Sequence, residues 1–204
     1  MTDRRATPLR ESDLDLDPLR QFEAWYAAAG AAGEPFPQAF ALATADASGR
    51  PSVRMVLLKS ADETGFVFFT SYESRKGREL VANPRAALCF NWHGLGRQVR
   101  IEGTAARVTE AEADTYFETR PLGSRLSASV SHQSEIVGGR EELKSAATEL
   151  RSRLGEDVPR PEHWGGFRVA PDSYEFWQHR DDRLHDRFRY RWAGDAWVVE
   201  RLAP

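Results

Sequence analysis

The 204-residue sequence contains a single cysteine, Cys89, so no disulfide can form within the chain. Small proteins of oxidising compartments are often rich in disulfides, and the lone thiol therefore favours a cytoplasmic location. Cys89 lies in the apolar stretch 86–92, where we expect it to be a core residue. At this length a chain can bury a sizeable core without covalent cross-links.

Long hydrophobic runs and an excess of positive charge are also missing. No apolar stretch approaches the roughly 20 residues that cross a bilayer, and no signal peptide is predicted at the start of the chain. The formal net charge is −3, whereas non-specific nucleic-acid binding needs a broad basic surface. We therefore expect neither a membrane nor a nucleic acid as a partner.

Several catalytic motifs are absent as well. The five histidines show no HxH, HxxxH or HExxH spacing, and no second thiol is available, so we predict no metal site. No GxSxG occurs, which argues against a serine hydrolase of that type. There is no GxxxxGK[ST], and the one GxG, in residues 93–96, lacks a third glycine and leads into a predicted strand. A P-loop and a dinucleotide-binding fingerprint are both excluded on this pattern.

Short strand-like stretches joined by tight turns dominate what is present. We predict strands over residues 39–45, 51–59, 66–70, 86–92, 97–108, 164–169, 173–178, 183–192 and 196–202. Helices are predicted over residues 18–30, 75–83, 110–120 and 140–154, and residues 121–134 are expected to form a polar loop. This order favours a mainly β (α+β) fold, an antiparallel barrel or sandwich with inserted helices, and disfavours a doubly wound sheet. We expect one domain over residues 17–204, preceded by a flexible N-terminal segment, residues 1–16.

Cationic side chains are concentrated in four segments. Arg54 and Lys59 bracket an apolar strand, where they could equally be edge charges that protect a sheet. Arg75 and Lys76 lie at the N-terminus of a predicted helix, where a cation is unfavourable unless an anion is bound. Free backbone N–H groups at a helix N-terminus favour phosphate, although a solvated surface turn remains the alternative.

The third segment combines an arginine with two hydroxyl groups. Tyr116 and Arg120 are four residues apart on a predicted helix, so they share one face, and Ser124 follows. An arginine with two hydroxyls could hold a phosphate, but such triples also arise by chance.

The fourth segment, residues 183–192, alternates between cationic and mostly apolar residues. If it is a strand, one face carries Arg183, His185, Arg187, Arg189 and Arg191, and the other carries Leu184, Asp186, Phe188, Tyr190 and Trp192. A solvated face would explain Arg189 and Arg191, but it explains the first three less well. Together, the four segments predict a phosphorylated ligand or cofactor.

These segments, taken in order, resemble the pyridoxine/pyridoxamine 5′-phosphate oxidase family. The matching motifs are RMVLLK (54–59), SRKGREL (74–80), RQVRIEG (97–103), YFETRP (116–121), SHQS (131–134), WGGFRV (164–169), EFWQ (175–178), RLHDRF (183–188) and the C-terminal ERLAP. The resemblance implies an FMN-binding split β-barrel that works as a homodimer, with FMN at the subunit interface and a C-terminal region for dimerisation and substrate binding. The sequence departs from the family pattern at Phe69, where a tyrosine is common, and at Ser129, where we expect a tryptophan.

The resemblance also implies roles for individual residues. FMN would be bound by Arg54, Met55, Val56, Leu57, Leu58, Lys59, Phe69, Thr70, Arg75, Lys76, Gln98, Gln133, Ser134, Trp177 and Arg187. The substrate would be bound by Lys59, Tyr116, Arg120, Ser124, Arg183 and His185, of which Arg183 and His185 would be the catalytic pair at the pyridine ring. A guanidinium suits that position because it is planar, permanently charged and stacks on aromatic rings.

The implied activity is the FMN-dependent oxidation of pyridoxamine or pyridoxine 5′-phosphate to pyridoxal 5′-phosphate by O2. Hydrogen peroxide would be released, with ammonia from the amine, in vitamin B6 salvage. Two alternatives stay open: a related flavin oxidase with another substrate, such as the phenazine-biosynthesis branch, and a non-catalytic flavin- or haem-binding split barrel. Lys59, Tyr116, Arg120 and Ser124 favour a phosphorylated substrate, and Arg183 with His185 favours catalysis.

Overall fold

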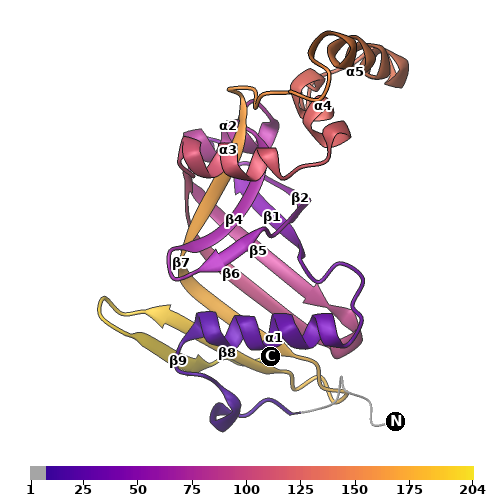
Figure 1. The fold of residues 1–204 in the computed structure, drawn as a ribbon. Coiled ribbons are helices and arrows are strands. Elements are labelled where there is room, and N and C mark those ends of the chain that lie inside the picture. The colour runs from indigo at the N-terminus through magenta and orange to yellow at the C-terminus, as the bar shows by residue number, and fades with distance from the viewer. Residues whose placement is uncertain (1–7) are drawn as a thin grey trace.

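The computed structural model describes residues 8–204, which form one curled antiparallel sheet flanked by helices (Figure 1). The strands are β1 (Ala39–Ala45), β2 (Pro51–Leu57), β3 (Ser60–Asp62), β4 (Gly65–Ser71), β5 (Arg85–Trp92), β6 (Arg97–Arg107), β7 (Trp164–Gln178), β8 (Asp186–Trp192) and β9 (Trp197–Arg201). The helices are α1 (Pro18–Ala31), α2 (Arg75–Ala82), α3 (Glu110–Glu118), α4 (Leu122–Val130) and α5 (Arg140–Leu154), with short 3-10 turns η2 (Glu11–Asp13) and η3 (His93–Leu95). The predicted mainly β fold with flanking helices is confirmed.

Every strand pair in this part of the chain is antiparallel, in the order β2-β1-β5-β6-β7-β4-β3. The sheet curls, so that β2 and β4 contact each other across its open side. The backbone N–H of Lys59, just after β2, donates to the carbonyl of Val67 in β4 at 2.9 Å. The two strands that carry many of the predicted site residues are therefore held side by side.

The long strand β7 joins the two ends of the molecule. Residues 164–169 of β7 pair with β4, and residues 173–178 pair with β8 on the same edge, while β6 follows β7 along its other edge. Pro171, which has no N–H to donate, lies between these two pairings. Opposite it, Gly103 approaches so closely that an added Cβ would lie 2.1 Å from the carbonyl oxygen of Ala170. The strand therefore changes partners where its backbone cannot form a regular ladder.

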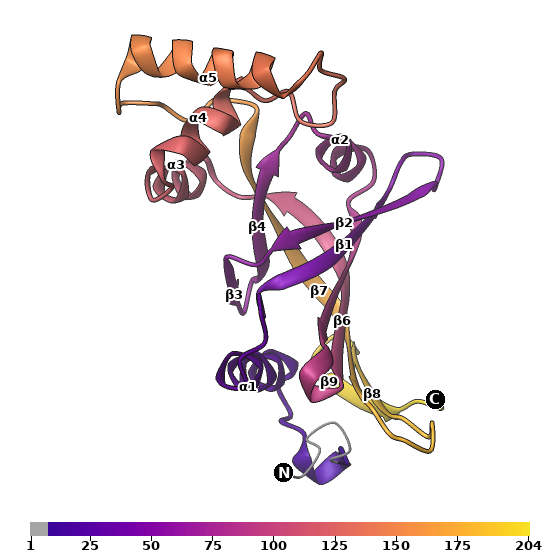
Figure 2. The same cartoon turned by 90° about the vertical axis from the view of Figure 1, so that its right-hand side faces the viewer.

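Aromatic side chains fill the core between the sheet and α1. Asp17 caps α1 by accepting a hydrogen bond from the N–H of Leu19, and Pro18 occupies the first helical position. Phe22 packs edge-on against Phe66 at 4.9 Å between ring centroids. Figures 1 and 2 show α1 and the β8–β9 hairpin at one end of the sheet, and α2 to α5 at the other.

Most predicted elements are present, with four corrections. Residues 121–134 were expected to form a polar loop, which was wrong, because α4 occupies Leu122–Val130. The two strands predicted over 164–169 and 173–178 are one continuous strand, and the short strand β3 was not predicted. The predicted strand over residues 183–192 begins only at Asp186.

The last of these corrections, the late start of β8, has a backbone cause. Arg183 has φ +65°, in the left-handed region that a strand residue does not adopt. Leu184 is consequently not on an apolar strand face and is 67% exposed. From Asp186 onwards the alternation holds, with Phe188 and Tyr190 buried.

Residues 8–16, which belong to the segment expected to be flexible, contact the sheet. Leu9 is buried, and its N–H donates to Asp186 Oδ2 at 3.1 Å. The hydroxyl of Tyr190 donates to the carbonyl of Asp15 at 2.7 Å. The rest of that segment, residues 1–7, lies outside the described residues. None of the described helices combines the length and apolar character needed to cross a membrane.

Candidate active site

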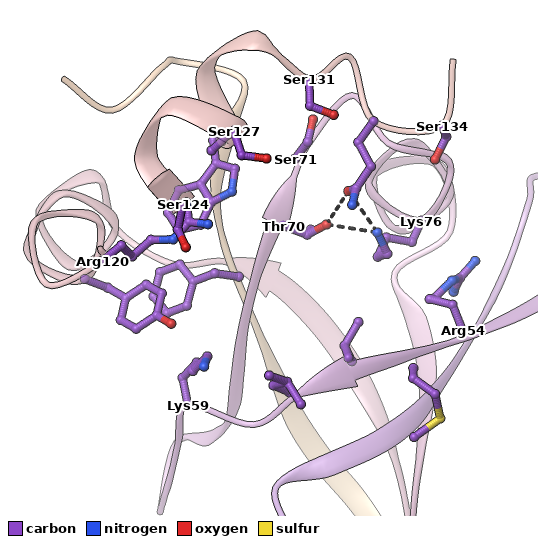
Figure 3. Close-up of a pocket in the computed structure, with 18 of the residues that line it drawn as sticks. Arg54, Lys59, Thr70, Ser71, Lys76, Arg120, Ser124, Ser127, Ser131 and Ser134 are labelled. Atoms are coloured by element: carbon purple, nitrogen blue, oxygen red, sulfur yellow. Dashed lines mark hydrogen bonds between the residues drawn. The ribbon is translucent and has the colours of Figure 1, made fainter. Parts of the chain in front are cut away.

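A pocket of about 940 Å³ opens between β2, β4 and helices α2, α3 and α4. It is lined by Ser52, Val53, Arg54, Met55, Val56, Leu57, Lys59, Phe69, Thr70, Ser71, Arg75, Lys76, Tyr116, Thr119, Arg120, Pro121, Ser124, Ser127, Ala128, Ser131, Gln133, Ser134 and Trp164. Five of these side chains are cationic and none is a carboxylate. The pocket therefore favours anions, with two groups of cations at different places on its wall (Figure 3).

The first group lies at the N-terminus of α2. Ser74 caps this helix, its Oγ accepting a hydrogen bond from the N–H of Gly77 at 3.2 Å. Lys76 is only 7% exposed, and its Nζ donates to Thr70 Oγ1 at 3.0 Å and to Gln133 Oε1 at 3.1 Å (Figure 3). Burial, with a contribution from the charge of Arg54, lowers the pKa of Lys76 to about 8. A cation buried among neutral partners at a helix N-terminus is suited to bind a phosphate.

Glu79, one turn further along α2, forms hydrogen bonds with two of the arginines near this helix end. Its carboxylate accepts hydrogen bonds from Arg75 Nε at 2.8 Å and from Arg54 Nη2 at 3.1 Å, and also from the hydroxyls of Thr44 and Ser52. Burial alone would raise the pKa of Glu79, but the four donors outweigh it and lower the pKa to about 2. Glu79 therefore stays ionised and fixes two arginines from different elements.

The second group lies where α3 and α4 meet β4. The guanidinium of Arg120 stacks over the ring of Trp164 at 4.4 Å, and burial lowers its pKa. The ring of Tyr116 stacks on Phe69 with centroids 4.0 Å apart, and Lys59 Nζ lies 5.6 Å from the Tyr116 centroid. These side chains form a wall of stacked rings with cations at its rim.

Two buried arginine atoms in this region have no hydrogen-bond acceptor among the described residues. They are Nη1 of Arg120 and Nε of Arg125. Because buried donors are nearly always paired, Arg120, which lines the pocket, has a donor free for an acceptor from a water or a ligand.

A separate cluster of predicted residues lies on β6, β7, β8 and the loop before β8. Gln98 pairs with Trp177, and Trp177 pairs with Arg187, across neighbouring strands. The ring of His185 lies 4.6 Å from that of Trp177. Arg187 forms an ion pair with the buried Glu175 at 2.8 Å and also donates to the carbonyl of Ala203. None of these residues lines the pocket within one chain.

The structure thus divides the predicted site residues into two sets. The pocket brings together Arg54, Met55, Val56, Leu57, Lys59, Phe69, Thr70, Arg75, Lys76, Tyr116, Arg120, Ser124, Gln133 and Ser134. Gln98, Trp177, Arg183, His185 and Arg187 lie outside it. The strand β8, which begins just after His185, is at the end of the sheet opposite helices α2 to α4 (Figure 1). Leu58 lies outside it as well, because its side chain packs against the core.

Sequence reasoning missed several polar residues of the pocket. Ser127 and Ser131 join Ser124 on its wall, at the i, i+3 and i+7 spacing of one helix face. That signal was hidden because α4 was not predicted. Glu79 was missed because its spacing of four from Arg75 resembles an ordinary surface ion pair. No group of three or more potential metal ligands occurs among residues 8–204.

Comparisons with known proteins agree with this geometry. Residues 31–154 match the family model described as pyridoxamine 5′-phosphate oxidase, and residues 164–204 match the pyridoxine 5′-phosphate oxidase C-terminal dimerisation region. A pyridoxine/pyridoxamine 5′-phosphate oxidase of Cupriavidus taiwanensis is 54% identical over 197 residues, covering 96% of this chain and 93% of that protein. The protein of the same name from Ralstonia pickettii is 52% identical, covering 100% of this chain and 96% of that protein.

Two solved structures have the same fold. PhzG from Burkholderia lata, in complex with tetrahydrophenazine-1-carboxylic acid, superimposes with a TM-score of 0.92 at 37% identity, covering 98% of this chain and 100% of that chain. A pyridoxamine 5′-phosphate oxidase-related, FMN binding protein from Nostoc punctiforme gives a TM-score of 0.75 at 16% identity, covering 94% of this chain and 100% of that chain. The second similarity concerns the fold alone.

Proposed function

The chain belongs to the pyridoxamine 5′-phosphate oxidase family, and on that premise we propose that it is an FMN-dependent pyridoxal 5′-phosphate synthase. It would oxidise pyridoxamine or pyridoxine 5′-phosphate with O2, releasing hydrogen peroxide, and ammonia from the amine. The observation that carries the proposal is the presence of two anion-binding groups in one pocket. They match two phosphates, one on the cofactor and one on the substrate.

The residues around the N-terminus of α2 fit the phosphate of FMN. Arg54, Arg75 and Lys76 contribute three positive charges and Glu79 one negative charge, which leaves a net charge of +2. A phosphate monoester carries −1.5 to −2 at pH 7, so the charges are nearly balanced. Beside this group, Val53 and Met55 of β2 are 68% and 64% exposed, an apolar surface suited to a flavin ring or to a partner subunit.

The second anion-binding group fits the substrate phosphate. Lys59 and Arg120 supply charge, and the hydroxyls of Tyr116 and Ser124 supply donors within the same pocket. The buried Nη1 of Arg120 lacks an acceptor among residues 8–204, and a phosphate oxygen would provide one.

A homodimer would reunite the two sets of site residues. Gln98, Trp177, Arg183, His185 and Arg187 lie away from the pocket in one chain, and residues 164–204 match a dimerisation region. In a twofold dimer each chain presents the same surfaces, so the hairpin of one chain can complete the pocket of the other. We place FMN at that interface, held by the pocket of one subunit and by Gln98, Trp177 and Arg187 of its partner.

The chain's own residues would orient the substrate and balance its charge. When bound, the flavin supplies the redox chemistry, taking a hydride from the 4′ carbon of the substrate and passing the electrons to O2. Arg183 would lie over the pyridine ring and restrict its position, and His185 would hydrogen-bond the ring's phenolic oxygen. Holding the reacting atoms in one geometry removes much of the entropic part of the barrier.

The direct test is turnover by the purified protein. We expect it to take up FMN and to form pyridoxal 5′-phosphate from both phosphorylated substrates with consumption of O2. Unphosphorylated pyridoxine should be a far poorer substrate because it leaves Arg120 without its acceptor. Equal turnover with and without the phosphate, or absence of flavin uptake, would refute the assignment.

A second candidate function follows from the similarity to PhzG. That structure contains tetrahydrophenazine-1-carboxylic acid, a ligand that carries a carboxylate instead of a phosphate. Oxidation of such a compound at a rate above that of the B6 phosphates would favour this alternative. The identity of 54% to a pyridoxine/pyridoxamine 5′-phosphate oxidase, against 37% to PhzG, favours the B6 phosphates.

A further inference from the structure

The loop that connects β7 to β8, residues 179–185, is closed by its own hydrogen bonds. The N–H of Arg183 donates to the carbonyl of Arg180 at 3.1 Å, and the N–H of Leu184 donates to Asp182 Oδ1 at 3.0 Å. At the base of the loop, the N–H of His179 donates to the carbonyl of Gly96 at 2.8 Å. These bonds tie the loop both to itself and to the turn before β6.

One further bond in this loop determines the proton position on His185. The backbone N–H of Arg180 donates to His185 Nδ1 at 3.0 Å. A backbone amide can only donate, so Nδ1 must carry a lone pair, and the proton of the neutral ring must be on Nε2.

The other ring nitrogen of His185 is available to a ligand. Within residues 8–204, Nε2 of His185 takes part in no hydrogen bond, whereas the ring itself packs beside Trp177 at 4.6 Å and His179 at 5.4 Å. The ring is therefore fixed in orientation and presents a single N–H donor.

We propose that the backbone amide of Arg180 locks His185 in its neutral Nε2–H tautomer, so that His185 acts on the substrate as a hydrogen-bond donor and not as a general base. The inference rests on the proposed function for the identity of the acceptor, the oxygen substituent of the pyridine ring. A donor at this position favours the ionised form of that oxygen. A base at this position would need a free lone pair, and the one that His185 has is already bonded to Arg180.

The tautomer itself can be measured without any activity. In protein labelled with ¹⁵N-histidine at pH 8, above the ordinary histidine range, the two nitrogens of His185 should show one protonated and one unprotonated resonance, with the proton on Nε2. The spectrum of His185→Gln, which lacks these resonances, assigns them. A proton on Nδ1, or fast averaging of the two resonances, would overturn the proposal even if the enzyme oxidises B6 phosphates normally.

A pair of variants at position 180 tests the backbone donor. Arg180→Pro removes both the arginine side chain and the backbone N–H, whereas Arg180→Ala removes the side chain and keeps the N–H. The tautomer signature should persist in Arg180→Ala and be lost, or become averaged, in Arg180→Pro. An unchanged signature in a folded Arg180→Pro variant would contradict the proposal, and the wild-type spectrum decides the question if that variant does not fold.

Two substitutions of His185 test the role of the free donor. The amide nitrogen of glutamine can occupy the position of Nε2, whereas asparagine reaches only the position of Nδ1. We expect His185→Gln to keep kcat/KM within about tenfold of wild type and His185→Asn to lose on the order of a hundredfold. Equal losses in both variants would refute a donor role, whereas inactivity of the wild-type protein would refute the proposed function and leave the tautomer measurement valid.

Discussion

The pocket and the β8–β9 hairpin are both rich in arginine, but their charges are balanced in different ways. The pocket is lined by five cations and no carboxylate, with Glu79 behind two of them. In the hairpin, Arg187 pairs with Glu175, Arg189 with Glu200, and Arg201 with Asp186.

This difference indicates a division of labour. A surplus of positive charge on the pocket wall favours anionic ligands, and Nη1 of Arg120 has no acceptor within residues 8–204. The hairpin arginines are paired with carboxylates within the chain, so they add little net charge and stabilise the hairpin. We interpret the pocket as the part of the site that binds the phosphates, and the hairpin with its preceding loop as the part that positions the flavin and pyridine rings.

The largest expected effect is on activity, when a variant defective in the pocket is mixed with a variant defective in the loop before the hairpin. Arg120→Ala and Arg183→Leu should each lower kcat/KM by about ten- to a hundredfold, and Arg183→Leu should raise KM and lower kcat while FMN binding stays nearly intact. If the two parts come from different subunits, a mixed dimer has one doubly defective site and one intact site. Random exchange makes half the dimers mixed, so mixing should restore about one quarter of wild-type activity.

The control for this experiment is the exchange itself. Mass spectrometry of the mixture should detect mixed dimers, and each variant alone should keep its own loss of activity at the same concentration. Mixed dimers without recovery would mean that one subunit supplies both parts, and the proposed interface would be wrong.

The next effect concerns the affinity for FMN. Arg75→Ala removes a charge-assisted hydrogen bond worth about 1.5–3 kcal/mol, so FMN affinity should fall about ten- to a hundredfold. Saturating FMN should then restore much of the turnover. Arg78→Ala is the matched control, because Arg78 lies on the same helix but outside the pocket. Equal losses in the two variants would argue against a phosphate contact by Arg75.

Glu79 should contribute to stability in a pH-dependent way. Its pKa falls from the usual 4.5 to about 2 in the folded protein, so the stabilisation is complete above about pH 4.5 and is lost as the pH falls towards 2. Allowing for solvent screening in an open pocket, Glu79→Gln should lower the free energy of unfolding of the apoprotein by about 2 kcal/mol at pH 6. Denaturant unfolding should show the difference from wild type shrinking between pH 4.5 and 2. A constant difference over that range would mean that the carboxylate charge is not what stabilises the fold.

A smaller effect should appear in the pH dependence of FMN binding. Burial lowers the pKa of Lys76 to about 8, so the free protein loses this positive charge as the pH rises above 8. A phosphate favours the charged form, and FMN affinity should therefore fall above pH 8, by at most about tenfold per pH unit. Lys76→Met should bind FMN more weakly and without this dependence between pH 7 and 9. Riboflavin, which lacks the phosphate, should show no such dependence with either protein.

Much of this architecture could be predicted from the sequence because local signals agree with the final fold. The cap of α1 at Asp17 and the capping box of α3 at Thr109 and Glu112 both form as expected. The helix α4 could not be predicted in the same way, because Pro121 provides no side-chain cap and Leu126 is its one buried residue. Its stability comes from packing, which a local pattern does not reveal.

The candidate site was harder to predict than the fold. Arg183 fits a period-two pattern in the sequence, but its left-handed backbone reflects a turn closed by Arg180, which periodicity cannot detect. The resemblance to a family grouped residues that one chain keeps apart, and in our proposal a second copy brings them together. Glu79 of α2 accepts hydrogen bonds from Thr44 of β1 and Ser52 of β2, and contacts between residues so far apart in the sequence leave no local pattern.

The smallest effects should come from the outer part of the hairpin. Arg189 pairs with Glu200 at 2.6 Å and Arg191 approaches the same carboxylate at 3.6 Å, and all three side chains are about one third exposed or more. Exposed ion pairs contribute little because water and salt screen them. Arg189→Ala and Arg191→Ala should therefore leave FMN affinity, kcat/KM and the unfolding midpoint within experimental error of wild type. Arg187→Ala, on the same face of β8, should lower both stability and FMN affinity, because its partner Glu175 is buried. If Arg189→Ala proved as harmful as Arg187→Ala, the ligand-binding surface of the hairpin would extend further along β8 than we propose.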